Sequence, residues 1–198
     1  MIGRAWYIHV DDPAGPDVLC WRMADILEIR SRAEQTAYNL RRWDEVLSES
    51  TWHQVEGRVE TDRHGRIVMS PPPAPRHGRF QHKIQMLLET LMPPGEVLPE
   101  CPISTADGVR AADVAWVSPQ RWRALGNRAC FVQSPELCVE IISPANSDEE
   151  IREKIALYFD AGAEEVWTCG SFGQMTFFGP GSTPLQKSKL CPDFPVGV

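Results

Sequence analysis

The chain has 198 residues, of which 42% are hydrophobic and 24% are charged, a composition typical of one globular domain that is long enough to bury a core. No apolar run approaches the length of a membrane span and the N-terminus lacks a signal-peptide core, so we expect a cytoplasmic protein with no membrane partner. The net charge of −7 argues against a surface that coats nucleic acid broadly.

Helices and strands are mixed along the chain. Residues 1–31 form an N-terminal extension to which no structure is assigned, and residues 32–198 form one domain. In chain order we expect a helix over 31–47, strands over 52–59 and 66–69, a proline-rich connector over 71–75, a helix over 77–91, strands over 96–103, 110–117 and 137–142, a helix that carries Lys154, and strands over 165–169 and 175–178. This order predicts an α/β (α+β mixed) fold with a central mixed β-sheet flanked by helices.

Six cysteines are scattered along the chain, at positions 20, 101, 130, 138, 169 and 191, and no two of them form a CxxC pair. In a cytosolic chain of this size, such spacing favours reduced thiols that pack as small apolar side chains over zinc ligands or disulfides.

One strand that is otherwise apolar contains a charged residue. Leu137–Ile142 is a short run bounded by prolines, which is typical of a buried strand. Glu140 lies in its middle, on the same pleat face as Cys138 and Ile142. A lone ionised carboxylate at this place would be costly, so Glu140 needs a cation or a metal as its partner.

Two further charges lie in apolar patterns. Lys154 falls inside the apolar arc that Ile151, Ile155 and Tyr158 form on their helix, and Asp113 opens the strand expected over 113–117. Two carboxylates from neighbouring strands can hold Mg²⁺, and a nearby lysine can orient or deprotonate the attacking water. This set therefore suits metal-assisted phosphodiester hydrolysis. The residues alone leave open a second interpretation, a buried Glu140–Lys154 ion pair beside an Asp113 that merely begins its strand.

Two windows of the sequence are basic and contain no acidic residue. The first runs from Arg63 to Lys83 and includes Arg66, Arg76 and Arg79. The second runs over 114–135, where Arg121, Arg123 and Arg128 are the only charged residues. These windows are either a local phosphate-binding face or ordinary surface scatter, and we expect DNA binding to depend on Arg76, Arg79 and Lys83.

Three segments together resemble a known family. They are MSPPPAPRHGRFQHKIQMLLETL, GVRAADVAWVS and PELCVEIISP, followed by Lys154, Tyr158 and GAEEVW. The series is similar to the Uma-two family of restriction endonucleases, within the PD-(D/E)xK nuclease superfamily, from about Asn39 to Phe194. The resemblance implies a restriction endonuclease-like core and a Mg²⁺- or Mn²⁺-dependent endonuclease acting on DNA.

The resemblance also implies roles for particular residues. Asp113, Glu140 and the backbone carbonyl of Ile141 would be the metal ligands. The superfamily lysine would normally stand at the position of Ile142, and in this family Lys154 on the helix substitutes for it. Asp113, Glu140 and Lys154 are then the catalytic residues.

Accessory residues follow less directly from the same pattern. His77 matches a family histidine, and it either helps to hold a phosphate at the positive end of its helix or caps that helix. Ser143 either contacts phosphate or water or caps the following helix. His53 stands where the family has an acid, four residues before Gly57, which leaves Glu56 as the candidate accessory acid.

Other functional classes remain open on the same fold. The chain could be a catalytically silent nucleic-acid-binding module, or a protein-interaction module in which the charged residues are structural. A homodimer would supply the two active sites that double-strand cleavage needs, although no segment demonstrates one.

Overall fold

A computed structural model describes residues 30–50, 57–144 and 146–198. The helices are α2 (Arg32–Ser48), α3 (Pro75–Leu91), α4 (Pro119–Leu125) and α5 (Asp148–Asp160), with a 3-10 turn, η2 (Pro180–Ser182). The strands are β1 (Arg58–Thr61), β2 (Ile67–Ser70), β3 (Glu96–Thr105), β4 (Gly108–Val117), β5 (Leu137–Ile141), β6 (Glu165–Cys169), β7 (Met175–Gly179) and β8 (Thr183–Leu185).

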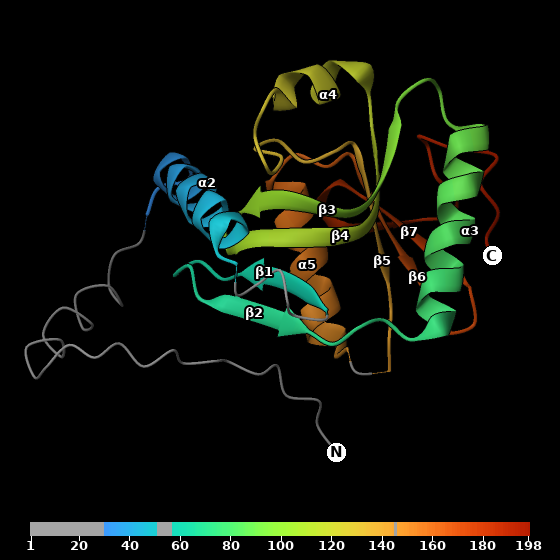
Figure 1. The fold of residues 1–198 in the computed structure, drawn as a ribbon. Coiled ribbons are helices and arrows are strands. Elements are labelled where there is room, and N and C mark those ends of the chain that lie inside the picture. Colours follow the sequence, from blue (N-terminus) through green and yellow to red (C-terminus); the bar gives the residue numbers. More distant parts are fainter. Residues whose placement is uncertain (1–29, 51–56, 145) are drawn as a thin grey trace, which may run out of the picture.

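A six-stranded sheet forms the centre of the fold, in the order β3-β4-β5-β6-β7-β8 (Figure 1). β5 and β6 are parallel, and the other neighbours in this sheet are antiparallel. The predicted central mixed sheet flanked by helices is therefore confirmed.

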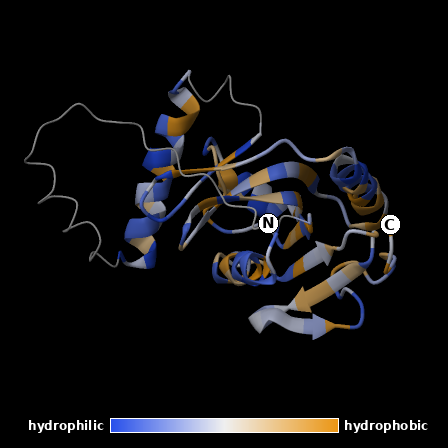
Figure 2. Ribbon diagram, turned by 90° about the horizontal axis from the view of Figure 1, so that it is seen from below, coloured by the Kyte–Doolittle hydropathy of each residue, from blue (hydrophilic) through white to orange (hydrophobic). Residues whose placement is uncertain are grey.

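The two faces of this sheet have different helices packed on them. Phe80, Ile84 and Leu88 of α3 pack on one face, and Ile151 and Ile155 of α5 pack on the other. Figure 2 shows the helices striped with hydrophobic and hydrophilic residues, as amphipathic helices on a sheet require. Each fully buried side chain of this size contributes about 1.5–3 kcal/mol. These helices therefore fix the sheet between two apolar layers.

The hairpin of β1 and β2 lies beside β4, and α2 packs against this region (Figure 1). Trp43 and Val46 of α2 form a third apolar cluster with Ile67 and Val109. Asn39 of the same helix donates from Nδ2 to the Gly108 carbonyl at 3.2 Å, at the start of β4. The hairpin is thus held against the sheet, with the polar side chains of β1 directed toward β4.

Some boundaries differ from the sequence predictions. β4 begins at Gly108 rather than Asp113, so Asp113 lies inside its strand instead of opening it. Ser147, and not Ser143, caps α5, because its hydroxyl accepts from the backbone N–H of Glu150 at 3.2 Å. α4 and β8 were not predicted, and the strand expected over 52–59 lies mostly outside the described residues.

Within the described ranges, the five cysteines are buried and none is in a disulfide, in agreement with the prediction of packed thiols. Among the helices of these ranges, none has the length and apolar character needed to cross a membrane. The extension over 1–31 falls almost entirely outside the described residues, so the proposed domain division stays a prediction.

Candidate metal centre

The sheet brings two of the predicted carboxylates together. Val114 of β4 pairs with Val139 of the antiparallel strand β5. Asp113 precedes Val114 and Glu140 follows Val139, so the next step in this register places the two acids opposite each other. Asp113 is 1% exposed and Glu140 is 3% exposed. The backbone N–H of Ile141 donates to Asp113 Oδ2 at 2.6 Å, which ties the Asp113 carboxylate to the end of β5.

Asp113 is held ionised by its neighbours. Its Oδ1 atom forms an ion pair with the Arg58 guanidinium and lies 3.4 Å from His77 Nε2. Burial raises the pKa of Asp113, but His77 and Arg58 outweigh burial, and the pKa lies well below its usual range. A carboxylate that stays charged inside a protein is a natural ligand for a hard cation.

Glu140 is in a different electrostatic environment. Its Oε1 atom accepts a hydrogen bond from the Tyr158 hydroxyl at 2.6 Å, and Lys154 Nζ lies 3.2 Å from its Oε2 atom. Burial raises the pKa of Glu140 to about 7, although Lys154 opposes that rise. Glu140 and Asp113 are therefore neighbouring carboxylates of very different acidity.

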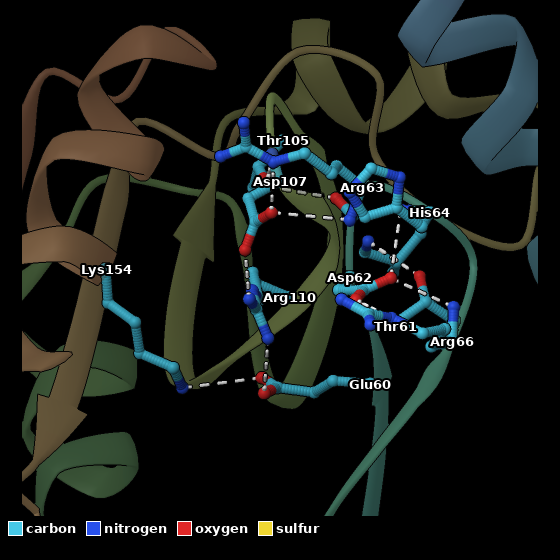
Figure 3. Close-up of polar contacts among 12 residues, drawn as sticks. Glu60, Thr61, Asp62, Arg63, His64, Arg66, Thr105, Asp107, Arg110 and Lys154 are labelled. Atoms are coloured by element: carbon cyan, nitrogen blue, oxygen red, sulfur yellow. Dashed lines mark hydrogen bonds and ion pairs between the residues drawn. The ribbon is translucent and has the colours of Figure 1, made fainter. Parts of the chain in front are cut away.

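Lys154 connects two buried carboxylates. Its Nζ atom lies 3.4 Å from Oε1 of Glu60, a contact that Figure 3 shows. The same atom lies 3.2 Å from Oε2 of Glu140. Burial lowers the pKa of Lys154, but these two carboxylates outweigh burial and the net pKa is raised. The ammonium group therefore stays charged between β1 and β5.

Glu60 is a site residue that sequence reasoning missed. Its side chain is 5% exposed, accepts from the backbone N–H of Ala111 at 2.8 Å and pairs with Arg110 at 3.6 Å. Figure 3 shows this contact continuing from Arg110 to Asp107, in the turn between β3 and β4. The signal in the sequence was Glu60 following Arg58 by two residues, which places both on one face of a strand.

A second set of candidate metal ligands shares Asp113 with the predicted set of Asp113, Glu140 and the Ile141 carbonyl. His77, Glu100 and Asp113 each offer one ligand atom, and these atoms lie within 4.8 Å of one another. His77 Nε2 is buried without a well-oriented hydrogen-bond partner. Carboxylate oxygens with one imidazole nitrogen suit Mn²⁺ and admit Mg²⁺. The residues present therefore fit a divalent cation of the predicted kind.

The N-terminal part of α3 supplies one side of this centre. His77 and Gln81 are four residues apart and so lie on one face of the helix. Gln81 Nε2 donates to Glu100 Oε1 at 2.9 Å and to the Asp113 carbonyl at 2.8 Å. His77 does not cap α3, because Ala74 is the N-cap residue and makes no side-chain capping bond. Glu100, like Glu60, was not predicted.

The remaining predicted residues have varied surroundings. The backbone N–H and hydroxyl of Ser143 both donate to Asn146 Oδ1 at 2.9 Å, in the turn before α5. Glu56 lies outside the described residues, so its accessory role stays a prediction.

The basic windows separate into exposed and internally bound residues. Arg76, Arg79 and Lys83 are exposed on α3, at a spacing that places them on one face. Arg121, in contrast, forms ion pairs with Glu136 at 3.2 Å and Glu164 at 2.9 Å. The second window therefore contributes a structural arginine at this position.

The mixed sheet with helices on both faces has the arrangement that the sequence predicted for a restriction endonuclease-like core. The model of the Uma2 family, described as "Putative restriction endonuclease", matches residues 44–174. The chain belongs to the Uma2 family, as its motifs predicted.

One solved structure gives an independent comparison of the fold. It is described as a "putative nuclease belonging to DUF820 from Anabaena variabilis ATCC 29413". The two chains are 18% identical and superimpose with a TM-score of 0.58, over 75% of this chain and 86% of that one. No curated protein matches the chain.

Proposed function

We propose that the chain is a metal-dependent endonuclease that hydrolyses phosphodiester bonds in DNA, with Asp113, Glu140 and Lys154 as its catalytic residues. The observation that carries this proposal is one continuous set of contacts from three elements. The Asp113 carboxylate of β4 accepts a hydrogen bond from the β5 backbone next to Glu140, and Lys154 of α5 forms an ion pair with Glu140. Membership of the Uma2 family supports the nuclease class.

Two donor sets that share Asp113 could hold the cation. The family resemblance gives Asp113, Glu140 and the Ile141 carbonyl, whereas the clustered ligand atoms are those of Asp113, His77 and Glu100. When bound, Mg²⁺ or Mn²⁺ would polarise the phosphoryl group and lower the pKa of a coordinated water. Glu140, with its raised pKa, is suited to accept a proton near neutral pH.

Lys154 supplies a fixed positive charge beside this centre. Because Glu60 and Glu140 hold its ammonium group from two sides, the charge is oriented before substrate arrives. A preorganised cation at this place stabilises negative charge that develops on the phosphoryl oxygens. Glu60 acts as a positioning residue, since it contacts Lys154 rather than the reacting atoms.

The outer face of α3 is the proposed contact for the DNA backbone. Arg76, Arg79 and Lys83 are exposed there, while His77 on the same helix reaches Asp113. Phosphate contacts of this kind carry no base identity, and they weaken as salt rises. Replacing all three by alanine should lower affinity for every duplex sequence alike. Unchanged binding by the triple variant would place the DNA face elsewhere.

A catalytically silent module is the second candidate. The observation that favours it is the completeness of the Glu140 contacts, because a lysine and a tyrosine already satisfy a buried carboxylate. In that case Asp113 and Glu140 would stabilise the fold and bind no catalytic metal.

A plasmid-nicking assay in Mg²⁺ and Mn²⁺ distinguishes the two candidates. We expect nicking by the wild-type chain and its loss in Asp113→Asn and Glu140→Gln, with both variants folded. Glu153→Gln, an exposed acid on the same helix as Lys154, is the matched control and should keep its activity. Isothermal titration should show Mn²⁺ binding that both site variants lose. DNA binding without nicking and without metal binding would support the silent module.

A further inference from the structure

Arg58 makes an unusually complete set of contacts at the candidate metal centre. Its Nε and Nη2 atoms donate to the two carboxylate oxygens of Glu100 at 2.6 and 3.1 Å. Nη2 also donates to Asp113 Oδ1, and Nη1 donates to the Ala111 carbonyl at 3.2 Å. The side chain is 17% exposed. The planar guanidinium is therefore engaged at all three of its nitrogens, in the bidentate geometry that carboxylates prefer.

The two carboxylates that Arg58 joins face each other across β3 and β4. Pro99 pairs with Val114 and Cys101 with Ala112, so Glu100 and Asp113 lie opposite each other in this register, where the regular pairing is interrupted. Glu100 has φ +47, in the left-handed region that a side chain such as glutamate seldom adopts. Like charges placed directly opposite on antiparallel strands repel each other. The backbone thus holds two repelling carboxylates close together around a cation.

The same oxygens belong to the donor set of the candidate metal site. Glu100 and Asp113, with His77, are the residues whose ligand atoms converge within 4.8 Å. Arg58 uses both oxygens of Glu100 and one oxygen of Asp113, whose other oxygen accepts from the Ile141 N–H. A divalent cation and this guanidinium would compete for the same lone pairs, and each would repel the other.

We infer that Arg58 is an internal counter-ion that occupies the cation position between Glu100 and Asp113, and that a divalent metal must displace its guanidinium to bind these carboxylates. The inference rests on the proposed metal dependence and adds a residue that controls it. Arg58 keeps the acidic centre neutralised and folded without metal, at the cost of metal affinity.

The decisive experiment compares Mn²⁺ affinity, by isothermal titration, in wild type, Arg58→Gln and the double variant Arg58→Gln/Asp113→Asn. Removing the competing charge should tighten Mn²⁺ binding by about tenfold or more, and the double variant should lose that gain. Arg63→Gln is the matched control, because Arg63 also binds a carboxylate but is 59% exposed and lies outside the donor set. Its Mn²⁺ affinity should equal that of wild type.

A second measurement uses the wild-type chain in case Arg58→Gln does not fold. In metal-free protein the Arg58 Nε–H signal, assigned by its loss in Arg58→Lys, should exchange slowly because it donates to Glu100. Saturating Mg²⁺ should shift this signal and speed its exchange. An unchanged signal at saturation would overturn the inference.

The outcomes separate this inference from the proposed function. Equal or weaker Mn²⁺ binding by Arg58→Gln, with wild-type binding still lost in Asp113→Asn, would overturn the counter-ion role and leave the nuclease proposal standing. Mn²⁺ binding that appears in Arg58→Gln but not in wild type would support the counter-ion role and refute metal dependence of the natural chain.

Discussion

Replacing Lys154 by methionine tests the centre most directly, because this residue contacts two buried carboxylates. Lys154→Met removes the ammonium from 3.2 Å of Glu140 and 3.4 Å of Glu60, and keeps most of the buried aliphatic chain. Breaking a buried ion pair by removing one partner costs about 3–5 kcal/mol. Glu60 retains Arg110 and the Ala111 N–H, so we expect a loss near the lower end of that range.

The size of this loss should depend on pH. The pKa of Glu140 is raised to about 7, so its contribution to stability is complete below the unfolded value and decreases as pH rises through about 7. Without Lys154 this pKa rises further, and Glu140 in the variant stays protonated to higher pH. From pH 7 upward the variant should therefore lose stability with increasing pH by up to about 1.4 kcal/mol per unit, while the Glu140 contribution in wild type levels off.

The assay combines urea unfolding at several pH values with single-turnover DNA cleavage. If Lys154 is catalytic, saturating Mn²⁺ should restore most of the lost stability, and cleavage should fall by about two to four orders of magnitude. Lys187→Met, at an exposed lysine, is the control and should change neither measurement. Cleavage at the wild-type rate would remove Lys154 from the mechanism. Severe destabilisation that metal does not relieve would identify a structural ion pair.

Three further substitutions test the surroundings of the site. Tyr158→Phe removes the hydroxyl that donates to Glu140 at 2.6 Å, and it should cost about 1–3 kcal/mol in urea unfolding and raise the pKa of Glu140 further. Gly108→Ala should cost about 1–3 kcal/mol or more in the same assay, because φ is +85 and the added Cβ would collide with the Thr61 carbonyl. Glu165→Ala should lower the melting temperature by several degrees, because the buried carboxylate accepts from an indole, a hydroxyl and two backbone N–H groups that would be left without their acceptor.

The parts of the centre that could be predicted are those that violate a local pattern. Glu140 lies in an apolar strand and Lys154 lies in the apolar arc of a helix, so burial alone marks them as residues that need partners. The structure brings these two residues into contact. The spacing could not determine whether that contact is catalytic or structural, because both roles require it.

The missed residues depend on non-local register. Glu100 lies between Pro99 and Cys101 in a strand with no distinctive pattern, and its place opposite Asp113 follows from the tight turn that Gly108 completes. A glutamate in such a strand usually faces solvent, so its sequence neighbours carry no signal. Arg58 contacts strands more than 40 residues away, so its partners could not be predicted from its own segment.

Two further helix starts carry local signals in the sequence. Ser147 and Glu150 form a capping box, S-x-x-E, which marks the start of α5 more strongly than Ser143 does. Ser118 followed by Pro119 is likewise a typical helix start, and it begins α4. Both cases concern helix boundaries, which local chemistry determines.

The distribution of charge over the elements suits the proposed exchange of the Arg58 guanidinium for a divalent cation. Asp113, Glu140 and Glu100 stand on adjacent strands of the central sheet, where cross-strand register fixes the positions of their backbones. Arg58 comes from outside that sheet, on a long side chain with several rotatable bonds. A site made in this way keeps its carboxylates preorganised, while the Arg58 guanidinium can move as another positive charge enters. The acids and Lys154 are thus the fixed part of the site, and Arg58 is its adjustable part.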